Sequence, residues 1–259
     1  MDIARSRIWD QFRKDDNEYG SRVYEVKQLL DFIGLTLWLY NDCEVAFRGQ
    51  KQNWPLLPSV ARATGLAKSE REMLDQFKKE AVPFLDRTNF TDWQWLALAQ
   101  HNGMPTRLLD WTKNPLTALW FAIREPGGDQ ATPAIVWAYS YQFARIANSD
   151  ADQHPFDINQ SVIYFPEHLY QNIQAQDGLF TVHAKTSADE FANFEASKDF
   201  EPLTKIEIPA DDFWSMRYAL YRIGNHDGSL FPGLSGIAGK IKYHYLGLSD
   251  DPRACLSNP

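Results

Sequence analysis

The sequence predicts a single α+β domain in which a helical N-terminal half packs on a mixed or antiparallel sheet. The chain has 259 residues, of which 44% are apolar and 14% aromatic, so it can bury a full core. Apolar residues at helical spacing dominate the first half, and short apolar stretches typical of strands are interspersed later. These patterns favour one α+β domain at 23–248, a polar arm at 1–22 and a polar tail at 249–259.

Helices in the first half are predicted from apolar spacing and from residues that favour helix ends. The first helix covers 24–40, where apolar residues recur every three or four positions. The second covers about 70 to 82, behind a capping box formed by Ser69 and Glu72. A third and buried helix covers 93–100.

The remainder of the chain alternates between strands, helices and loops. A helix begins at Asn114-Pro115, because proline suits the first helical position. Another begins at Asp211 or Asp212, and the polar stretch 146–160 is predicted as a surface loop. Strands are predicted at 106–112, 133–141, 178–183 and 204–208.

Composition and motif content exclude several classes of protein. The net charge of −8 leaves no basic footprint for duplex DNA at the level of the whole chain. Cys43 and Cys255 match neither a zinc site nor a disulfide framework, so a cytoplasmic location is expected. No apolar run reaches the roughly 18 residues of a membrane span, so no membrane contact is expected. The histidines lack zinc-ligand spacing and no P-loop or Rossmann glycine pattern occurs, so we predict no metal.

The first candidate for a functional site is Phe47-Arg48-Gly49-Gln50, which follows an apolar stretch and is predicted to lie on or at the end of a strand. Glycine allows a ligand to approach the backbone, and a guanidinium group donates a fork of hydrogen bonds to phosphate or carboxylate. The alternative is an arginine in a structural ion pair at the end of a strand.

The second candidate runs from Gln100 to Thr112 and is dense in groups that donate, accept or titrate. On a strand, Arg107 and Trp111 face one way and Asp110 the other. The helix that begins at Asn114 offers free backbone N–H groups, so an arginine-bearing strand before it could form a diphosphate cradle. The alternative is that Arg107 and Asp110 are structural and that His101 caps a helix end.

Together these motifs resemble the FRG domain family, which is widespread in bacteria and phages and is named for the first motif. The resemblance covers roughly residues 25–240. Further stretches that resemble the family are Gln176-Asp177-Gly178-Leu179-Phe180-Thr181-Val182-His183 and Leu230-Phe231-Pro232-Gly233-Leu234. The segments of the long second motif are 96–101, 105–112, 114–116 and 118–122.

A more distant resemblance links the same motifs to the ADP-ribosyltransferase superfamily, and it implies a fold of that type. Arg48 is similar to the arginine that helps to hold NAD in those enzymes. The strand ending in Trp111-Thr112 and its following helix are similar to their second motif. Their third motif supplies a glutamate that stabilises an oxocarbenium ion, and no glutamate here matches it. Gly178 occupies the position where one is wanted, and Glu207 falls on the solvated face of its predicted strand.

The resemblance implies an NAD-dependent ADP-ribosyltransferase-like enzyme, or an NAD glycohydrolase. The acceptor would be nucleic acid, protein or a small molecule, and a toxin or anti-phage effector with a neutralising partner protein would suit this chemistry. A non-catalytic nucleotide- or phosphate-binding module that uses an Arg48 pocket is the alternative. A purely structural protein, whose motifs are core and ion pairs, is a third reading.

The residues expected to act fall into two groups. Arg48, Arg107 and the helix start near Asn114 should converge on one cleft. The expected catalytic residues are Arg48, His101, Arg107 and Asp110. The residues expected to bind NAD are Phe47, Arg48, Gly49, Gln50, Trp111, Thr112 and Asn114.

Overall fold

A computed structural model describes most of the chain, and its framework is one eight-stranded sheet. The described residues are 8–39, 44–62, 65–86, 88–125, 132–141, 146–147, 154–167, 171–187, 190–191, 193–196 and 203–247. In sheet order the strands are β1 (Arg13–Lys14), β2 (Arg22–Glu25), β8 (Thr204–Ile208), β5 (Ala134–Ser140), β3 (Val45–Gln50), β4 (Leu108–Thr112), β7 (Gly178–Val182) and β6 (Val162–Tyr164). The β2–β8 pair is parallel and the other described pairs are antiparallel, so the sheet is mixed.

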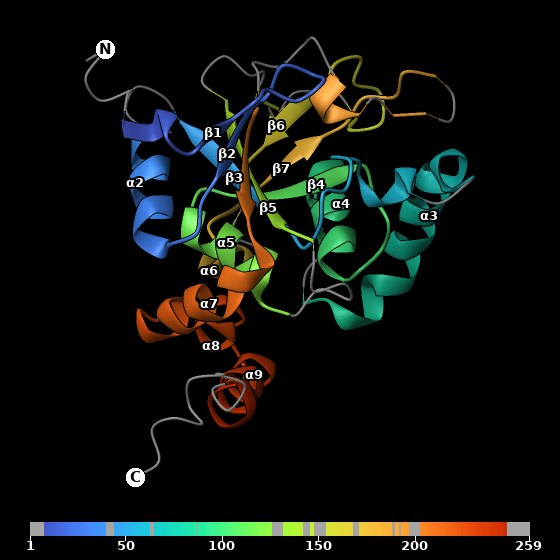
Figure 1. Ribbon diagram of the computed structural model, residues 1–259. Helices are drawn as coiled ribbons and strands as arrows, with labels where there is room; N and C mark the ends of the chain where they lie inside the picture. The colour runs from blue at the N-terminus through green and yellow to red at the C-terminus, as the bar shows by residue number, and fades with distance from the viewer. Residues whose placement is uncertain are drawn as a thin grey trace.

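Helices pack against this sheet in two groups (Figure 1). The first group and β2, β3, β5 and β8 share one apolar core. The second group and β4, β6 and β7 share another. The first group is α2 (Leu29–Leu39), α5 (Pro115–Ile123) and α7 (Phe213–Arg222), and the second is α3 (Leu66–Ala81), α4 (Asp92–His101) and α6 (Gln171–Ala175). At the foot of Figure 1, α8 (Asp227–Leu230) and α9 (Leu234–Lys242) follow α7. The predicted α+β single domain is confirmed.

The opposite face of the sheet is covered by irregular chain rather than by long helices. Trp111, Trp137 and Tyr139 point to this side and pack with Leu56 and Phe194, which lie outside the strands. Because side chains alternate along a strand, Trp111 on this face places its neighbour Asp110 on the helical face. The same alternation places Arg107 on the side of Trp111, opposite Asp110.

The predicted helices and strands are largely confirmed, and local chemistry explains their ends. Thr91 accepts a hydrogen bond from the backbone N–H of Gln94, whose side chain accepts from the backbone N–H of Thr91, so a capping box starts α4. Asn114 caps α5 by accepting from the backbone N–H groups of Leu116 and Thr117. All four predicted strands are present as β4, β5, β7 and β8.

Three predictions about the first half are wrong. The helix predicted at 24–40 begins only at Leu29, because the preceding residues form β2 and pair with β8. The α3 helix begins at Leu66 after Gly65, so the capping box at Ser69 does not start it. Part of the predicted arm belongs to the sheet, since Arg13–Lys14 pairs with β2.

Other elements were not expected from the sequence. These are β6, α6, α8 and α9, which are three, five, four and nine residues long. The first three are too short to show a periodic pattern of apolar residues. The described part of the predicted loop 146–160 contains only an isolated bridge, from Ile146 to Ile163, and 148–153 lie outside the described residues. Among the described residues, no helix is both long and apolar enough to cross a bilayer.

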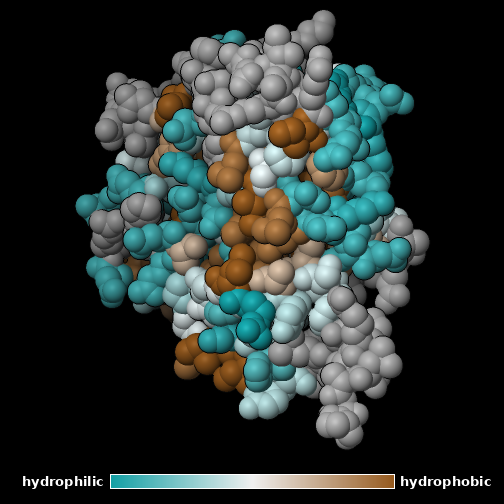
Figure 2. Space-filling view, turned by 60° about the vertical axis from the view of Figure 1, so that its left-hand side comes forward, coloured by the Kyte–Doolittle hydropathy of each residue, from teal (hydrophilic) through white to brown (hydrophobic). Residues whose placement is uncertain are grey.

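The face that carries α2 is not fully covered. Leu30 is 79% exposed and Leu37 is 64% exposed, whereas Phe32 and Leu35 on the other side of the helix are buried. Figure 2 brings this side of the molecule forward and shows a band of hydrophobic residues between hydrophilic ones. Apolar residues of α2 therefore lie on two sides of the helix, one packed against the core and one exposed to solvent.

Candidate functional site

A cavity of about 510 Å³ opens beside β3 and β4 on the helical face of the sheet. Its volume falls in the range of small-molecule sites, roughly 300–1,000 Å³. The walls come from six parts of the fold, namely β3, α4, β4, α5, α6 and the residues after α8. The lining residues are Phe47, Arg48, Gly49, Gln100, His101, Asp110, Trp111, Thr112, Ala118, Phe121, Asn172, Gln176 and Phe231.

Arg48 supplies the positive charge of the cavity. Its side chain is 16% exposed, and its Nη1 donates a hydrogen bond to the backbone oxygen of Asp110 at 2.7 Å. The same nitrogen lies 3.9 Å from Oδ2 of the Asp110 carboxylate. The Nε atom is buried and has no hydrogen-bond partner among the described residues. Part of the hydrogen-bonding capacity of the guanidinium is therefore unused.

Burial lowers the pKa of Arg48 to about 10, although the charge of Asp110 raises it and that of Arg62 lowers it further. Arg48 is still protonated at neutral pH. A buried cation that is only partly compensated favours the approach of an anion, because the anion would supply the missing charge and hydrogen bonds.

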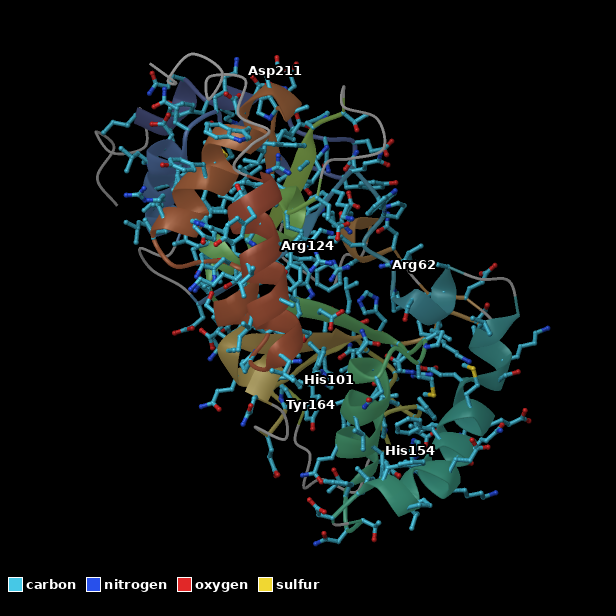
Figure 3. All side chains as sticks on the ribbon, turned by 90° about the horizontal axis from the view of Figure 1, so that it is seen from below. Arg62, His101, Arg124, His154, Tyr164 and Asp211 are labelled. Atoms are coloured by element: carbon cyan, nitrogen blue, oxygen red, sulfur yellow. The ribbon has the colours of Figure 1, made fainter. Side chains whose placement is uncertain are left out.

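Asp110 and Gln100 form the polar rim opposite Arg48. Gln100 Nε2 donates to Asp110 Oδ2 at 3.0 Å, and the Asp110 side chain is 60% exposed. His101 follows Gln100 at the end of α4 and is labelled in the view from below (Figure 3). Burial lowers the pKa of His101 and the charge of Asp110 partly offsets this, so its imidazole is largely neutral at pH 7.

An aromatic wall closes another side of the cavity. The rings of Phe121 and Phe231 lie 6.1 Å apart at 83°, and Trp120 contacts Phe231 at 5.7 Å between centroids. Arg124, also labelled in Figure 3, lies with its guanidinium carbon 5.0 Å from the Trp120 ring and 5.7 Å from that of Phe121. The cavity thus combines a cation and a carboxylate with flat apolar surfaces.

The chain that leads from β4 into α5 borders the cavity through Thr112, the last residue of β4, rather than through Asn114. Thr112 Oγ1 donates to the backbone oxygen of Gln176 and accepts from the backbone N–H of Asn114. Asn114 Oδ1 accepts from the first free N–H groups of the helix, those of Leu116 and Thr117. Asn114 does not line the cavity, and its cap occupies donors that the predicted diphosphate cradle would use.

Arg107 lies outside the cavity, and the expected convergence of Arg48 and Arg107 on one cleft is not found. Its side chain is 2% exposed and pairs with Glu70, which is 1% exposed. Arg107 Nε and Nη2 both donate to Glu70 Oε2, at 3.0 and 2.9 Å, and Nη1 donates to the backbone oxygen of Pro155. Phe156 and Phe191 lie against the guanidinium. Strand alternation explains the separation, because Arg107 and Asp110 have opposite parity.

The remaining residues of the first motif serve the fold as well as the cavity. Gly49 lies against α5: a Cβ there would be 1.9 Å from the backbone oxygen of Ala118. Gln50 is buried and accepts a hydrogen bond from Trp137 Nε1 at 3.0 Å, so it does not line the cavity. Phe47 is fully buried, and the Trp111 indole donates to Thr181 on the far face of the sheet.

Several lining residues were not predicted as site residues. Gln100, Phe121, Gln176 and Phe231 all lie within stretches that resemble the FRG family, which was a usable signal. Asn172 lies in none of those stretches. No glutamate lines the cavity among the described residues, and Glu207 instead pairs with Lys14 and Lys205 on β8. Within the described part of the chain, no group of three or more His, Cys, Asp or Glu residues is arranged to hold a metal ion.

The fold and the cavity define an α+β protein with an arginine–carboxylate site beside an aromatic wall. Residues 43–130 match the family model of the FRG domain. This range holds β3, α4, β4 and α5, so it supplies Arg48, Gln100, His101 and Asp110. The FRG resemblance is therefore confirmed over this range. No curated protein and no solved structure matches the chain.

Proposed function

We propose that this protein is an NAD-dependent enzyme of the ADP-ribosyltransferase type and that NAD binds in the Arg48 cavity. The observation that carries the proposal is the meeting of Arg48, His101 and Asp110 in one cavity of about 510 Å³ with an aromatic wall. Each half of this arrangement matches one half of a dinucleotide. The guanidinium suits a diphosphate, and the rings of Phe121 and Phe231 suit a flat heterocycle.

The reaction breaks the glycosidic bond between C1′ of ribose and N1 of nicotinamide. The electron pair of that bond leaves with nicotinamide, and positive charge develops on the ribose as an oxocarbenium ion. A carboxylate close to this charge stabilises it electrostatically. Asp110 fills this role in the proposal, because no glutamate is present among the described lining residues.

An acceptor then forms a new bond at C1′ and loses a proton. The His101 imidazole suits the role of general base, since its lowered pKa leaves it neutral and able to take a proton near pH 7. A nucleic-acid, protein or small-molecule hydroxyl or amine would give a transferase, and water would give an NAD glycohydrolase. Such an activity suits a toxin or an anti-phage effector, and it would call for a neutralising partner protein in the producing cell.

The test measures nicotinamide release and label transfer from labelled NAD, with RNA, DNA and protein acceptors. Arg48→Ala should weaken NAD binding roughly 10- to 100-fold, the value of a charge-assisted hydrogen bond. Arg71→Ala is the matched control, because Arg71 is exposed and pairs with Asp157 away from the cavity. Turnover that is unchanged in Arg48→Ala would remove Arg48 from the site.

A second candidate function is a non-catalytic nucleotide-binding module. The hydrogen bond from Gln100 to Asp110 favours it, since this bond occupies one oxygen of the carboxylate in the cavity. A rise in melting temperature with NAD, ADP or ADP-ribose but no nicotinamide release would select this function, because a ligand that binds only the native state stabilises it.

A further inference from the structure

A chain of hydrogen bonds leads from the Asp110 carboxylate into the protein. Gln100 Nε2 donates to Asp110 Oδ2 at 3.0 Å. The Thr106 hydroxyl donates to Gln100 Oε1 at 2.7 Å. Thr106 is fully buried, and its backbone N–H donates to Ser59 Oγ at 3.1 Å. This series of hydrogen bonds therefore connects the cavity to the contact of the buried Thr106 with Ser59.

The direction of these bonds follows from the groups at the two ends of the Gln100 amide, the Thr106 hydroxyl and the Asp110 carboxylate. Thr106 Oγ1 accepts a hydrogen bond from the backbone N–H of Leu108 at 3.1 Å, so its proton is free to be donated to Gln100. The amide oxygen of Gln100 then faces Thr106 and its NH₂ group faces Asp110. The reverse orientation would place an amide oxygen 3.0 Å from a carboxylate oxygen, where both are acceptors.

We propose that Gln100 is a positioning residue and that Ser59, Thr106 and Gln100 hold the Asp110 side chain in one orientation in the cavity. The NH₂ group can only donate, so it fixes Oδ2 as the acceptor of this hydrogen bond. Oδ1 has no hydrogen-bond partner among the described residues and is left for a donor on the ligand. The ligand class that follows carries an anionic group for Arg48 and a hydrogen-bond donor beside it.

This inference rests on the proposed function only in the choice of NAD as the probe. Thr106→Val keeps the shape of the side chain but removes the proton donor, so the Gln100 amide loses its fixed orientation. Thr106→Ser restores the donor and is the matched control. NAD affinity should fall about tenfold in Thr106→Val and stay within about threefold of wild type in Thr106→Ser.

The unliganded protein gives a second readout that does not depend on NAD. In ¹⁵N-labelled protein, the side-chain NH₂ signals of Gln100 should be displaced from the values of a solvated glutamine. They should return toward those values in Thr106→Val and in Asp110→Ala, and they should remain displaced in Thr106→Ser. A merely structural role for Thr106 would not give this pattern, because it would not depend on the hydroxyl alone.

Substitution of Gln100 itself tests the direction of the bond without altering a fully buried residue. Gln100→Glu places a second carboxyl group against Asp110, and the pair would share one proton. A protonated glutamic acid can donate as the amide does, so NAD binding by Gln100→Glu should strengthen as the pH falls. Gln100→Leu has no donor at any pH, so its weak binding should not recover.

The outcomes separate the two proposals. NAD binding by Thr106→Val that equals wild type, with unmoved Gln100 signals, would overturn the positioning role. A Thr106→Ser variant as weak as Thr106→Val would also overturn it. If wild type binds no NAD but the Gln100 signals follow the expected pattern, the positioning role stands and the proposed function fails.

Discussion

Two arginines, one in β3 and one just before β4, differ in how far their charge is compensated within the protein. Arg107 is enclosed by Glu70, a backbone oxygen and two aromatic rings, so its charge and its donors are satisfied within the protein. Arg48 bonds a backbone oxygen and lies 3.9 Å from the Asp110 carboxylate, and its Nε has no partner among the described residues. Of the two, Arg48 is therefore the arginine whose charge and donors are less fully compensated within the described residues.

The lowered pKa of Arg48 predicts an unusual loss of anion binding at high pH. An anion binds the protonated guanidinium, so affinity should be constant well below pH 10 and fall as the pH rises through about 10. An ordinary arginine would remain protonated to beyond pH 12. Isothermal titration with ADP between pH 8 and 11 measures this fall.

The control for this pH profile is Arg48→Ala, whose residual binding should show no additional fall near pH 10. Arg71→Ala should keep the wild-type profile, since it lies outside the cavity. Wild-type affinity that holds to pH 11 would mean that the guanidinium of Arg48 is still protonated there and that burial does not lower its pKa to about 10. The free energy of unfolding changes with pH in the opposite direction to ligand affinity. A lowered pKa means that the folded state disfavours the charged form of Arg48, so its contribution to stability increases as the pH rises above 10.

At this scale the sequence pointed to three titratable residues that line the cavity. Arg48, His101 and Asp110 were predicted from their chemistry and all line the cavity. Arg107 could not be told apart from Arg48, because its buried partner Glu70 lies 37 positions away and no local pattern pairs them. Phe231 is likewise brought to the cavity only by the fold.

At the scale of elements, the contact between β3 and α5 determines the shape of the cavity. Gly49 of β3 lies so close to α5 that an added Cβ would be 1.9 Å from the oxygen of Ala118 and 2.7 Å from the nitrogen of Ala122. Those distances are to backbone atoms, which cannot turn away as a side chain can. The glycine that the sequence suggested for ligand approach is therefore required for the approach of a helix.

Gly49→Ala should displace α5 or twist β3, and the overpacking should destabilise the protein by about 1–3 kcal/mol or more. NAD affinity should fall too, because Ala118 and Phe121 of α5 line the cavity. Urea denaturation gives the change in the free energy of unfolding. Gly224→Ala is the control: its φ is +90° but nothing lies within 4 Å of an added Cβ, so its cost should be only about 1–2 kcal/mol.

A loss of stability below about 1 kcal/mol in Gly49→Ala would contradict the close contact between β3 and α5. The control should also leave NAD affinity unchanged, since Gly224 lies at the end of α7 and does not line the cavity. A loss of affinity in both variants would point to a general loosening of the fold instead.

An element could be predicted when it was long enough to show a pattern and when the residues that stabilise it were close in sequence. The α4 and α5 helices were predicted because caps and apolar spacing lie in adjacent residues. The β2 strand was taken for the start of a helix, because its neighbour β8 is about 180 residues away and four residues carry too little pattern. Short elements such as α6 are formed by their packing rather than by propensity.

At the scale of the whole molecule, the cavity depends on the order of strands in the sheet. The sequence predicted the class of fold but gives no rule that places β3 between β4 and β5. This order brings Arg48 beside Asp110, 62 positions later in the chain. The wall is then completed by Gln176 and Phe231, which the residues of the matched range 43–130 do not include.

The same topology predicts that residues 43–130 do not fold by themselves. Within that range β3 and β4 share one paired position, Phe47 with Thr112. The other edge of β3 pairs along its whole length with β5, and β4 pairs along its whole length with β7, both outside the range. A fragment would therefore expose two strand edges, together with apolar side chains of α4 and α5 that share cores with the missing strands. It would lack the burial needed to offset chain entropy. Near-ultraviolet circular dichroism and a ¹H–¹⁵N spectrum of the fragment should show no fixed tertiary structure, whereas the full chain should unfold cooperatively in urea. A well-dispersed spectrum from the fragment would mean that β3 and β4 make a stable sheet without β5 and β7.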